Sequence, residues 1–419
     1  MPSRKAARII PIVAQGQATE ASGGKLEFRN PPPLSLYVHI PWCVRKCPYC
    51  DFNSHEARGP RSIAAATEIP EAEYLAALLA DLESALPLVW GRKVSSIFFG
   101  GGTPSLLSGP AVDQLLTALR TLLSVAPDAE ITLEANPGTV EPEKFAAFRD
   151  AGVNRLSLGI QSFNPTHLKA LGRIHDGSEA RRAIEIAAAH FDNFNLDLMY
   201  GLPAQTLEEA LADVETALAF APPHLSCYQL TIEPNTAFAS APPVLPDPDL
   251  CADMQEAIEA RLSSEENSAG YTHYETSAFA KPGRQCRHNL NYWAFGDYLG
   301  IGAGAHGKLT LHDRVLRQMR WKQPRQYMDK VGQATPLQEE VSVKTADLPF
   351  EFMMNALRLN QGFDAALFEA RTALPLLAIE NQLRQAEDDR LITRSPGRIA
   401  PTARGRRYLN RLLERFLSE

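Results

Sequence analysis

The chain has 419 residues, a formal net charge of -7 and an apolar fraction of 45%. This length allows one large domain with one or two smaller ones, and the mildly acidic balance lacks the global basic excess that would demand a nucleic-acid partner. Its six cysteines, three of them within one short stretch, do not form a disulfide framework. We therefore expect a reducing, cytoplasmic compartment.

Residues 1–33 are predicted to form a disordered tail. Arg4, Lys5 and Arg8 precede an apolar run that is interrupted by a proline and is too short for the apolar part of a secretory signal. No stretch of the sequence approaches the roughly 20 apolar residues of a membrane-spanning helix. The prolines at positions 31–33 then stiffen the approach to the first strand.

From Leu34 onward, apolar runs typical of buried strands alternate with segments of helical periodicity. Such an alternation indicates a parallel sheet that is covered on both faces. Six units predict an α/β fold, a partial (β/α)6 barrel related to the TIM barrel, over residues 34–270. The expected strands are Leu34–Ile40, Val94–Phe99, Glu130–Ala135, Arg155–Ile160, Phe194–Tyr200 and Leu225–Ile232. The expected helices are Glu71–Leu86, Ala111–Ser124, Pro142–Ala151, Gly177–His190, Thr206–Phe220 and Asp249–Ser264.

The loop after the first strand carries three cysteines, Cys43, Cys47 and Cys50. Thiolates are soft ligands that select iron–sulfur clusters, zinc or Cu(I). Three cysteines on a four-iron cluster would leave one iron free to bind another ligand. The residues alone also allow a zinc site completed by His39 or His55, or three reduced thiols in the core.

Most of the unusual polar and glycine residues lie on or just after the predicted strands. In barrels of this kind the chemistry gathers at the carboxyl ends of the strands. Singly, a glycine run after a strand is usually a tight turn, and a buried carboxylate often serves the local backbone. Together they predict a site, formed by Gly100, Gly101, Gly102 and Thr103 after the second strand, Glu134 on the third, Gln161 and the later Arg173 after the fourth, and Asp197 on the fifth.

The cysteine spacing resembles the signature of the radical S-adenosylmethionine (SAM) superfamily, C-x3-C-x2-C with an aromatic residue before the last cysteine, here Tyr49. This resemblance implies a [4Fe-4S] cluster held by Cys43, Cys47 and Cys50. It also implies that the amino and carboxylate groups of SAM chelate the open iron. An electron from the cluster would then cleave the sulfonium and give a 5′-deoxyadenosyl radical.

Four further stretches, residues 37–43, 100–104, 159–163 and 197–203, narrow this resemblance. They resemble the branch that contains oxygen-independent coproporphyrinogen III oxidases of the HemN type and their heme-chaperone relatives of the HemW type. The positive groups and hydroxyls of SAM suit carboxylate and amide partners, and its carboxylate suits an arginine. The cofactor contacts that the resemblance implies are Tyr37, Tyr49, Gly101, Gly102, Thr103, Glu134, Gln161, Arg173 and Asp197.

Two features favour the chaperone type within this branch. The oxidases carry a fourth cysteine two residues after the third, where this chain has Phe52. The pattern H-N-x-x-Y-W, with His288, Tyr292 and Trp293, resembles a motif tied to heme binding, and Cys286 is a rival heme ligand. Without the resemblance, a core aromatic cluster with a satisfied histidine would be the better interpretation.

Residues 271–346, which hold this motif and a glycine-rich loop at 300–307, are expected to extend the barrel, with 308–346 as a connection. Residues 347–419 predict a small winged-helix-like domain, similar to the C-terminal domain of the same branch. Its expected helices are Phe350–Asn360, Leu374–Gln385 and Thr402–Leu417, with a small hairpin before the last. The arginine-rich end raises a nucleic-acid-binding wing as a rival, but a solvated basic helix face is the better interpretation.

Together these features predict a heme chaperone that holds a [4Fe-4S] cluster, SAM and heme. Its expected partners are a heme-acceptor protein and an electron donor, with no nucleic acid. The sequence is compatible both with cleavage of SAM and with a structural role for it. An oxygen-independent coproporphyrinogen III oxidase is the first alternative, and a zinc-stabilised nucleic-acid-binding protein is the second.

Overall fold

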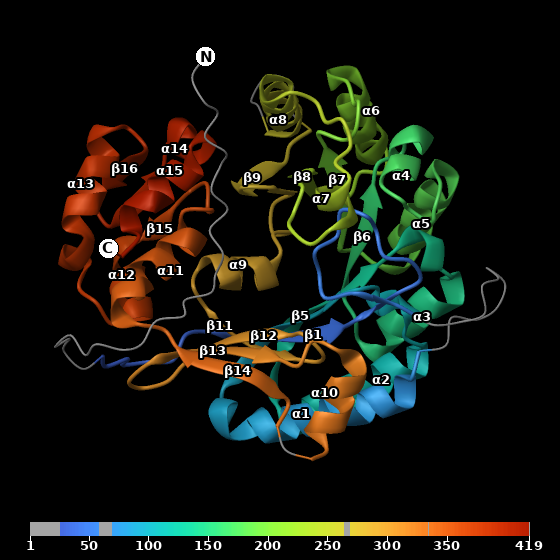
Figure 1. The fold of residues 1–419 in the computed structure, drawn as a ribbon, viewed down its shortest axis with the longest axis horizontal. Helices are drawn as coiled ribbons and strands as arrows, with labels where there is room; N and C mark the ends of the chain where they lie inside the picture. The colour runs from blue at the N-terminus through green and yellow to red at the C-terminus, as the bar shows by residue number, and fades with distance from the viewer. Residues whose placement is uncertain (1–25, 58–68, 264–268, 334, 419) are drawn as a thin grey trace.

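The computed structural model describes residues 26–57, 69–263, 269–333 and 335–418, which form a curved twelve-stranded sheet and a smaller C-terminal domain (Figure 1). The strand order of the sheet is β14-β13-β12-β11-β1-β4-β5-β6-β7-β8-β10-β9. Its parallel centre contains one further strand besides the six predicted ones, so the expected α/β architecture is confirmed. The six predicted strands are β1 (Leu34–Ile40), β4 (Lys93–Gly101), β5 (Ser124–Ala135), β6 (Arg155–Gln161), β7 (Phe194–Tyr200) and β8 (His224–Gln229).

Helices cover the outer face of this sheet (Figure 1). Leu36, Val38 and Ile40 of β1 are fully buried, as expected for a strand between packed layers. The start of α5 is fixed by a capping box in which Asp176 accepts bonds from the first-turn amides and Glu179 accepts one from Asp176. The helices of this layer are α1 (Glu71–Val89), α2 (Gly109–Leu122), α3 (Pro142–Ala151), α4 (Pro165–Ala170), α5 (Gly177–His190), α6 (Leu207–Leu218) and α8 (Pro248–Ser263). The short α7 (Ala237–Ser240) lies instead beside the cysteine loop, where the Phe238 amide donates to the Pro48 carbonyl.

The chain after α8 adds strands to both edges of the sheet. β9 (Thr272–Glu275) and β10 (Ala278–Ala280) extend the β8 edge, and α9 (Arg287–Trp293) then leads back to the β1 edge. There β11 (Asp297–Ile301) pairs parallel with β1. The antiparallel strands β12 (His306–Thr310), β13 (Val315–Arg320) and β14 (Leu337–Ser342), with α10 (Pro324–Val331), complete this edge.

The prediction that residues 308–346 form a connection is therefore wrong. Two of its strands, β12 and β13, carry buried charges, which hide the apolar pattern that identifies a strand. The Lys308 ammonium lies 2.8 Å from the Asp297 carboxylate, and Arg320 lies 3.3 Å from Asp81 on α1. These ion pairs satisfy the charged groups inside the fold, which is the condition for burying them.

The C-terminal domain has the helix and strand order of a winged helix, as expected, around a core that includes Phe352, Phe363 and Phe368. The predicted helix Leu374–Gln385 is wrong at its start, because a 3-10 turn follows Pro375 and the helix begins only at Glu380. The predicted helix Thr402–Leu417 is divided at Tyr408. The elements are α11 (Leu348–Ala356), β15 (Phe363–Asp364), α12 (Ala365–Thr372), α13 (Glu380–Asp388), β16 (Ile392–Ser395), β17 (Arg398–Pro401), α14 (Ala403–Arg407) and α15 (Leu409–Leu413).

Residues 26–33 belong to the fold and not to a disordered tail. The Phe28 amide donates to the His312 carbonyl over 2.9 Å, and its ring packs against Val315 and Leu348. Residues 1–25 of the predicted tail lie outside the described residues. Within the described ranges, none of the helices has the length and apolar character needed to cross a bilayer.

Candidate functional site

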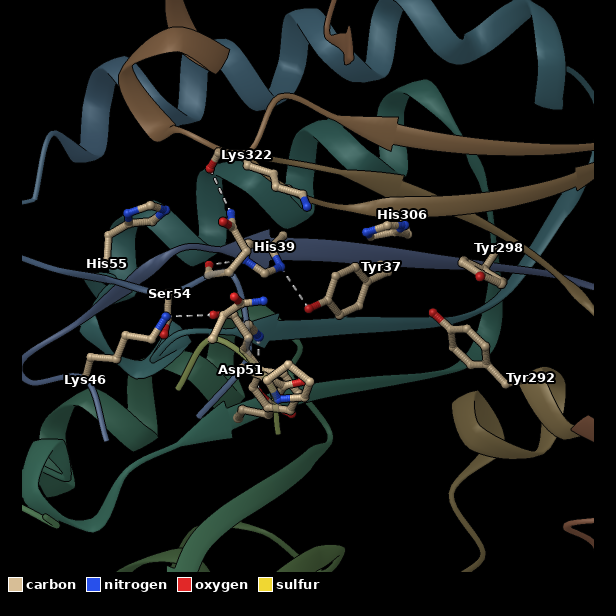
Figure 2. A pocket seen from close by; sticks show the side chains of 17 residues that line it. Tyr37, His39, Lys46, Asp51, Ser54, His55, Tyr292, Tyr298, His306 and Lys322 are labelled. Carbon is tan, nitrogen blue, oxygen red and sulfur yellow. Dashed lines mark hydrogen bonds between the residues drawn. The ribbon is translucent and has the colours of Figure 1, made fainter. Parts of the chain in front are cut away.

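Two adjoining cavities open where the parallel strands end. The cysteine cavity, about 370 Å³, contains Cys43, Cys47 and Cys50. The tyrosine cavity, about 820 Å³, contains Tyr37, Tyr292 and Tyr298 in its wall (Figure 2). Four residues line both cavities, so one wall separates them; these are Phe52, Ser54, Gly101 and Glu134.

The cysteine loop closes on itself through its backbone. The short strands β2 (Trp42–Cys43) and β3 (His55–Glu56) pair in parallel, and the Cys50 amide donates to the Cys47 carbonyl over 3.1 Å. Burial raises the pKa of the Cys43 and Cys50 thiols. A metal must therefore displace protons to bind here, as is usual for thiolate sites.

The alternative of a single zinc ion finds one of its two candidate histidines already engaged. Across the part of the chain that the structure describes, no three His, Cys, Asp or Glu side chains converge on one metal position. His39, proposed above as a fourth zinc ligand, already uses both ring nitrogens: Nδ1 lies 3.0 Å from the Tyr37 hydroxyl and Nε2 2.9 Å from the Asn53 carbonyl. The three cysteines instead surround a shared volume, which fits one cysteine per iron.

The glycine loop after β4 is pressed against the cysteine loop. The amides of Gly102 and Thr103 donate to the carbonyls of Ile40 and Trp42 over 2.8 and 2.7 Å. A Cβ at Gly102 would lie 2.5 Å from the Trp42 carbonyl oxygen, so only glycine fits. This close approach explains the local sequence without any ligand, and it also brings Thr103 into the cysteine cavity.

Two carboxyl groups face the cysteine cavity from β5 and β7. The Gly101 amide donates to Glu134 over 3.3 Å, and Asp197 accepts bonds from Ser157 and Asn195 over 3.0 and 2.8 Å. Desolvation, and next the charge of Asp197, raise the pKa of Glu134 to about 8. Burial also raises the pKa of Asp197. A cationic ligand would stabilise the ionised form of both groups.

Arg173 is one of two arginines, with Arg45, that line the cysteine cavity. Its Nη2 donates to the Gly159 carbonyl over 2.6 Å, and its Nη1 lies 3.6 Å from the Cys47 sulfur. Its buried Nε has no partner among the described residues. Gln161 and Tyr49 line the same cavity, so all the predicted SAM contacts except Tyr37 meet there. The donors and carboxylates present match the charges of a SAM molecule.

The histidine of the predicted heme motif is buried more deeply than the three cysteines. His288 is 3% exposed and lines neither cavity. Its Nδ1 lies 3.2 Å from the Ser96 hydroxyl, and its ring stacks on Phe98 at 4.9 Å between centroids. Desolvation lowers the pKa of His288 to about 3, so the ring is neutral.

The other residues of this motif lie partly at the tyrosine cavity and partly in the interior. Tyr292 reaches the tyrosine cavity, but Trp293 packs instead under the Arg358 guanidinium, 4.3 Å from its ring centre. Cys286 is 1% exposed, and its sulfur lies 3.6 Å from Glu130, which also accepts bonds from the first amides of α9. Of the heme residues expected from the motif, the structure brings only Tyr292 to a cavity.

Sequence reasoning did not single out the functional groups on the far wall of the tyrosine cavity. His306 begins β12 and Lys322 follows β13; both are exposed and line this cavity (Figure 2). Asn53 ties this wall to the cysteine loop, because its Nδ2 donates to the carbonyls of Ala303 and Lys322 over 2.9 and 2.8 Å. A lone histidine after a glycine run has no local signature, and only the sheet pairing of β12 reveals its position.

Comparison with known proteins agrees with this fold and site. A sequence profile described as the radical SAM superfamily matches residues 37–217, and one described as the HemN C-terminal domain matches residues 343–408. The solved structure of coproporphyrinogen III oxidase (HemN) from Escherichia coli superposes with a TM-score of 0.75 at 26% identity, covering 92% of this chain and 90% of that one. These features define a radical SAM protein.

Two relatives narrow the assignment further. The heme chaperone HemW of Escherichia coli (strain K12) is 52% identical over 390 residues, which are 93% of this chain and 99% of the relative. The heme chaperone HemW of Mycobacterium tuberculosis (strain ATCC 25618 / H37Rv) is 36% identical and covers 88% of this chain and 93% of its own. The chain belongs to the HemW family.

Proposed function

We propose that this protein binds heme in the tyrosine cavity and delivers it to an acceptor protein. The observation that carries the proposal is the cavity itself, about 820 Å³, within the range of about 300–1,000 Å³ typical of ligand sites. Its wall offers aromatic rings for a flat apolar ligand and lysines for anionic groups. The similarity to proteins named heme chaperones supports the same function.

The cysteine cavity is proposed to hold a [4Fe-4S] cluster on Cys43, Cys47 and Cys50, with SAM beside it. Glu134 and Asp197 would face the positive groups of SAM, and Arg173 its carboxylate. A cluster bound here would receive single electrons from an electron-donor protein and pass them on to SAM. All six cysteines are free thiols, which fits work in a reducing, cytoplasmic compartment.

Titration of the purified protein with hemin tests the proposal. We expect a saturable Soret change at one hemin per chain, and loss of heme that an acceptor accelerates beyond its spontaneous rate. Serum albumin treated in the same way provides the control for nonspecific adsorption. A change that is linear in hemin and never saturates would contradict heme binding by this protein.

Oxygen-independent coproporphyrinogen III oxidase is the second candidate, because HemN superposes over most of both chains. Phe52, which replaces the oxidases' fourth cysteine, is 61% exposed at the boundary of the two cavities. Hydrogen abstraction requires the substrate carbon close to the radical, and small misplacements are costly. With coproporphyrinogen, SAM and a reductant we expect no protoporphyrinogen, and turnover matching the loss of SAM would overturn the chaperone assignment.

A further inference from the structure

The tyrosine cavity contains an exposed imidazole that the heme motif does not include. His306 opens β12, and Figure 2 shows its ring between Tyr37 and Tyr298, above the floor formed by Tyr292. Histidine is a common axial ligand of heme iron, and the ring must reach the iron from the wall of the pocket. His306 meets this condition, because it is exposed and lines the cavity.

His288 does not meet it. Aromatic side chains lie between its ring and the cavity: its centroid is 4.9 Å from that of Phe98 and 5.0 Å from that of Tyr292. Phe98 in turn stacks on Tyr37 at 6.3 Å, and Tyr292 contacts Tyr298 at 4.3 Å. The imidazole of His288 thus packs behind the cavity floor, against Phe98, which supports Tyr37, and against Tyr292.

We infer that His306 is the axial ligand of heme in this protein and that His288 is a positioning residue that holds Tyr37 and Tyr292 in the cavity floor. The inference rests on the proposed heme binding and names the residue that would hold the iron. It also accounts for the H-N-x-x-Y-W pattern, since loss of the supporting ring would loosen the floor without removing a ligand.

The charged side chains around His306 also suit a heme whose iron is bound by this histidine. Lys322 and Lys46 are exposed at the cavity wall, where they can pair with the two propionates, and Asp51 is the carboxylate beside Lys46 (Figure 2). Desolvation lowers the pKa of His306, and Lys322, Arg317 and Arg320 act in the same direction against Glu339. The neutral imidazole is the form that binds metals.

Hemin titrations of the full-length protein and four variants test this assignment. His306→Ala should lose the Soret and electron paramagnetic resonance signature of histidine-ligated iron and bind hemin at least about tenfold more weakly, since even losing an outer partner of a metal ligand costs about 10–100-fold. Added imidazole should restore the signature in this variant. Lys322→Gln should weaken binding but keep the signature.

Two variants separate ligation from support. His312→Ala, at an exposed histidine in the turn after β12, is the matched control and should behave as the parent protein. His288→Phe keeps an aromatic ring and should retain the signature with weaker binding. If His306→Ala keeps the parent signature and affinity, or His288→Phe loses the signature, the assignment is wrong while heme binding stands. If the parent protein binds no hemin, the proposed function itself fails.

Discussion

The cysteine loop and the segment 286–293 both carry motifs, but they occupy different depths. The cysteines lie half-buried around a cavity, on a loop that backbone hydrogen bonds close. His288 lies in the interior, with its neighbours packed on both sides of the ring. Regular spacing of ligand-type residues on an open loop therefore indicates a binding site. Histidine and aromatic residues at helical spacing can instead support the side chains that line a cavity.

Removal of the cluster ligands should have the largest effect. Cys43→Ala, Cys47→Ala or Cys50→Ala should each abolish the brown colour and bound iron after anaerobic reconstitution, because each thiolate holds one iron. Cys227→Ala and Cys251→Ala are matched controls, since both cysteines lie outside the cysteine cavity, and should retain about four irons per chain. Stoichiometric zinc without charge-transfer absorbance would refute the cluster.

His288→Ala should chiefly lower stability. Truncating a fully packed ring leaves a cavity between Phe98 and Tyr292, and large-to-small changes of this kind cost about 2–5 kcal/mol. Urea unfolding followed by circular dichroism measures the loss. His312→Ala, whose side chain is exposed, should change the unfolding free energy very little. An unchanged stability would place His288 outside the packed interior and contradict the comparison.

Glu134→Gln should stabilise the ligand-free protein by an amount that grows as pH rises from about 4.5 to about 8. The carboxyl has a pKa of about 8 in the fold and an ordinary value of 4.5, so folding without ligand takes up a proton between these values and becomes less favourable as pH rises. The amide removes this cost, which we place at up to about 2 kcal/mol above pH 8, since one pKa unit corresponds to about 1.4 kcal/mol and cavity water screens the charge.

Thermal unfolding of this variant at pH 5 and pH 8.5 measures the effect. The gain over the parent protein should be small at pH 5 and larger at pH 8.5. Glu143→Gln, at an exposed position of α3, should show no such difference. An equal gain at both values of pH would mean that the cysteine cavity does not raise the pKa of the Glu134 carboxyl.

The smallest effect is expected at the contact between α9 and the C-terminal domain. Arg358 lies over the Trp293 ring and 3.8 Å from Glu275. Arg358→Ala should lower the unfolding free energy by about 1 kcal/mol, within the range for cation–π contacts. Urea unfolding measures this loss, with Arg325→Ala at an exposed site as the control. Equal effects of the two substitutions would show that Trp293 contributes no specific contact.

Much of the barrel follows from local patterns, because its strands are apolar on both faces. β1, β7, α3 and α5 begin and end where the periodicity predicts. β12 and β13 were not predictable in the same way, since Lys308 is buried through pairing with Asp297 on the neighbouring strand and Arg320 through pairing with the distant Asp81. His306 was missed for the same reason: its place in the cavity depends on that pairing. The cluster, SAM and heme assignments themselves stay predictions.

Asn53 joins the two cavities through one side chain. It sits on the cysteine loop, and its amide holds the carbonyls of Ala303 and Lys322, on the chain that presents His306. A change in the position of either the cysteine loop or this wall would therefore act on the other through these two hydrogen bonds. Such coupling is reciprocal by thermodynamic necessity, so what one site gains in affinity from its neighbour it returns in equal measure.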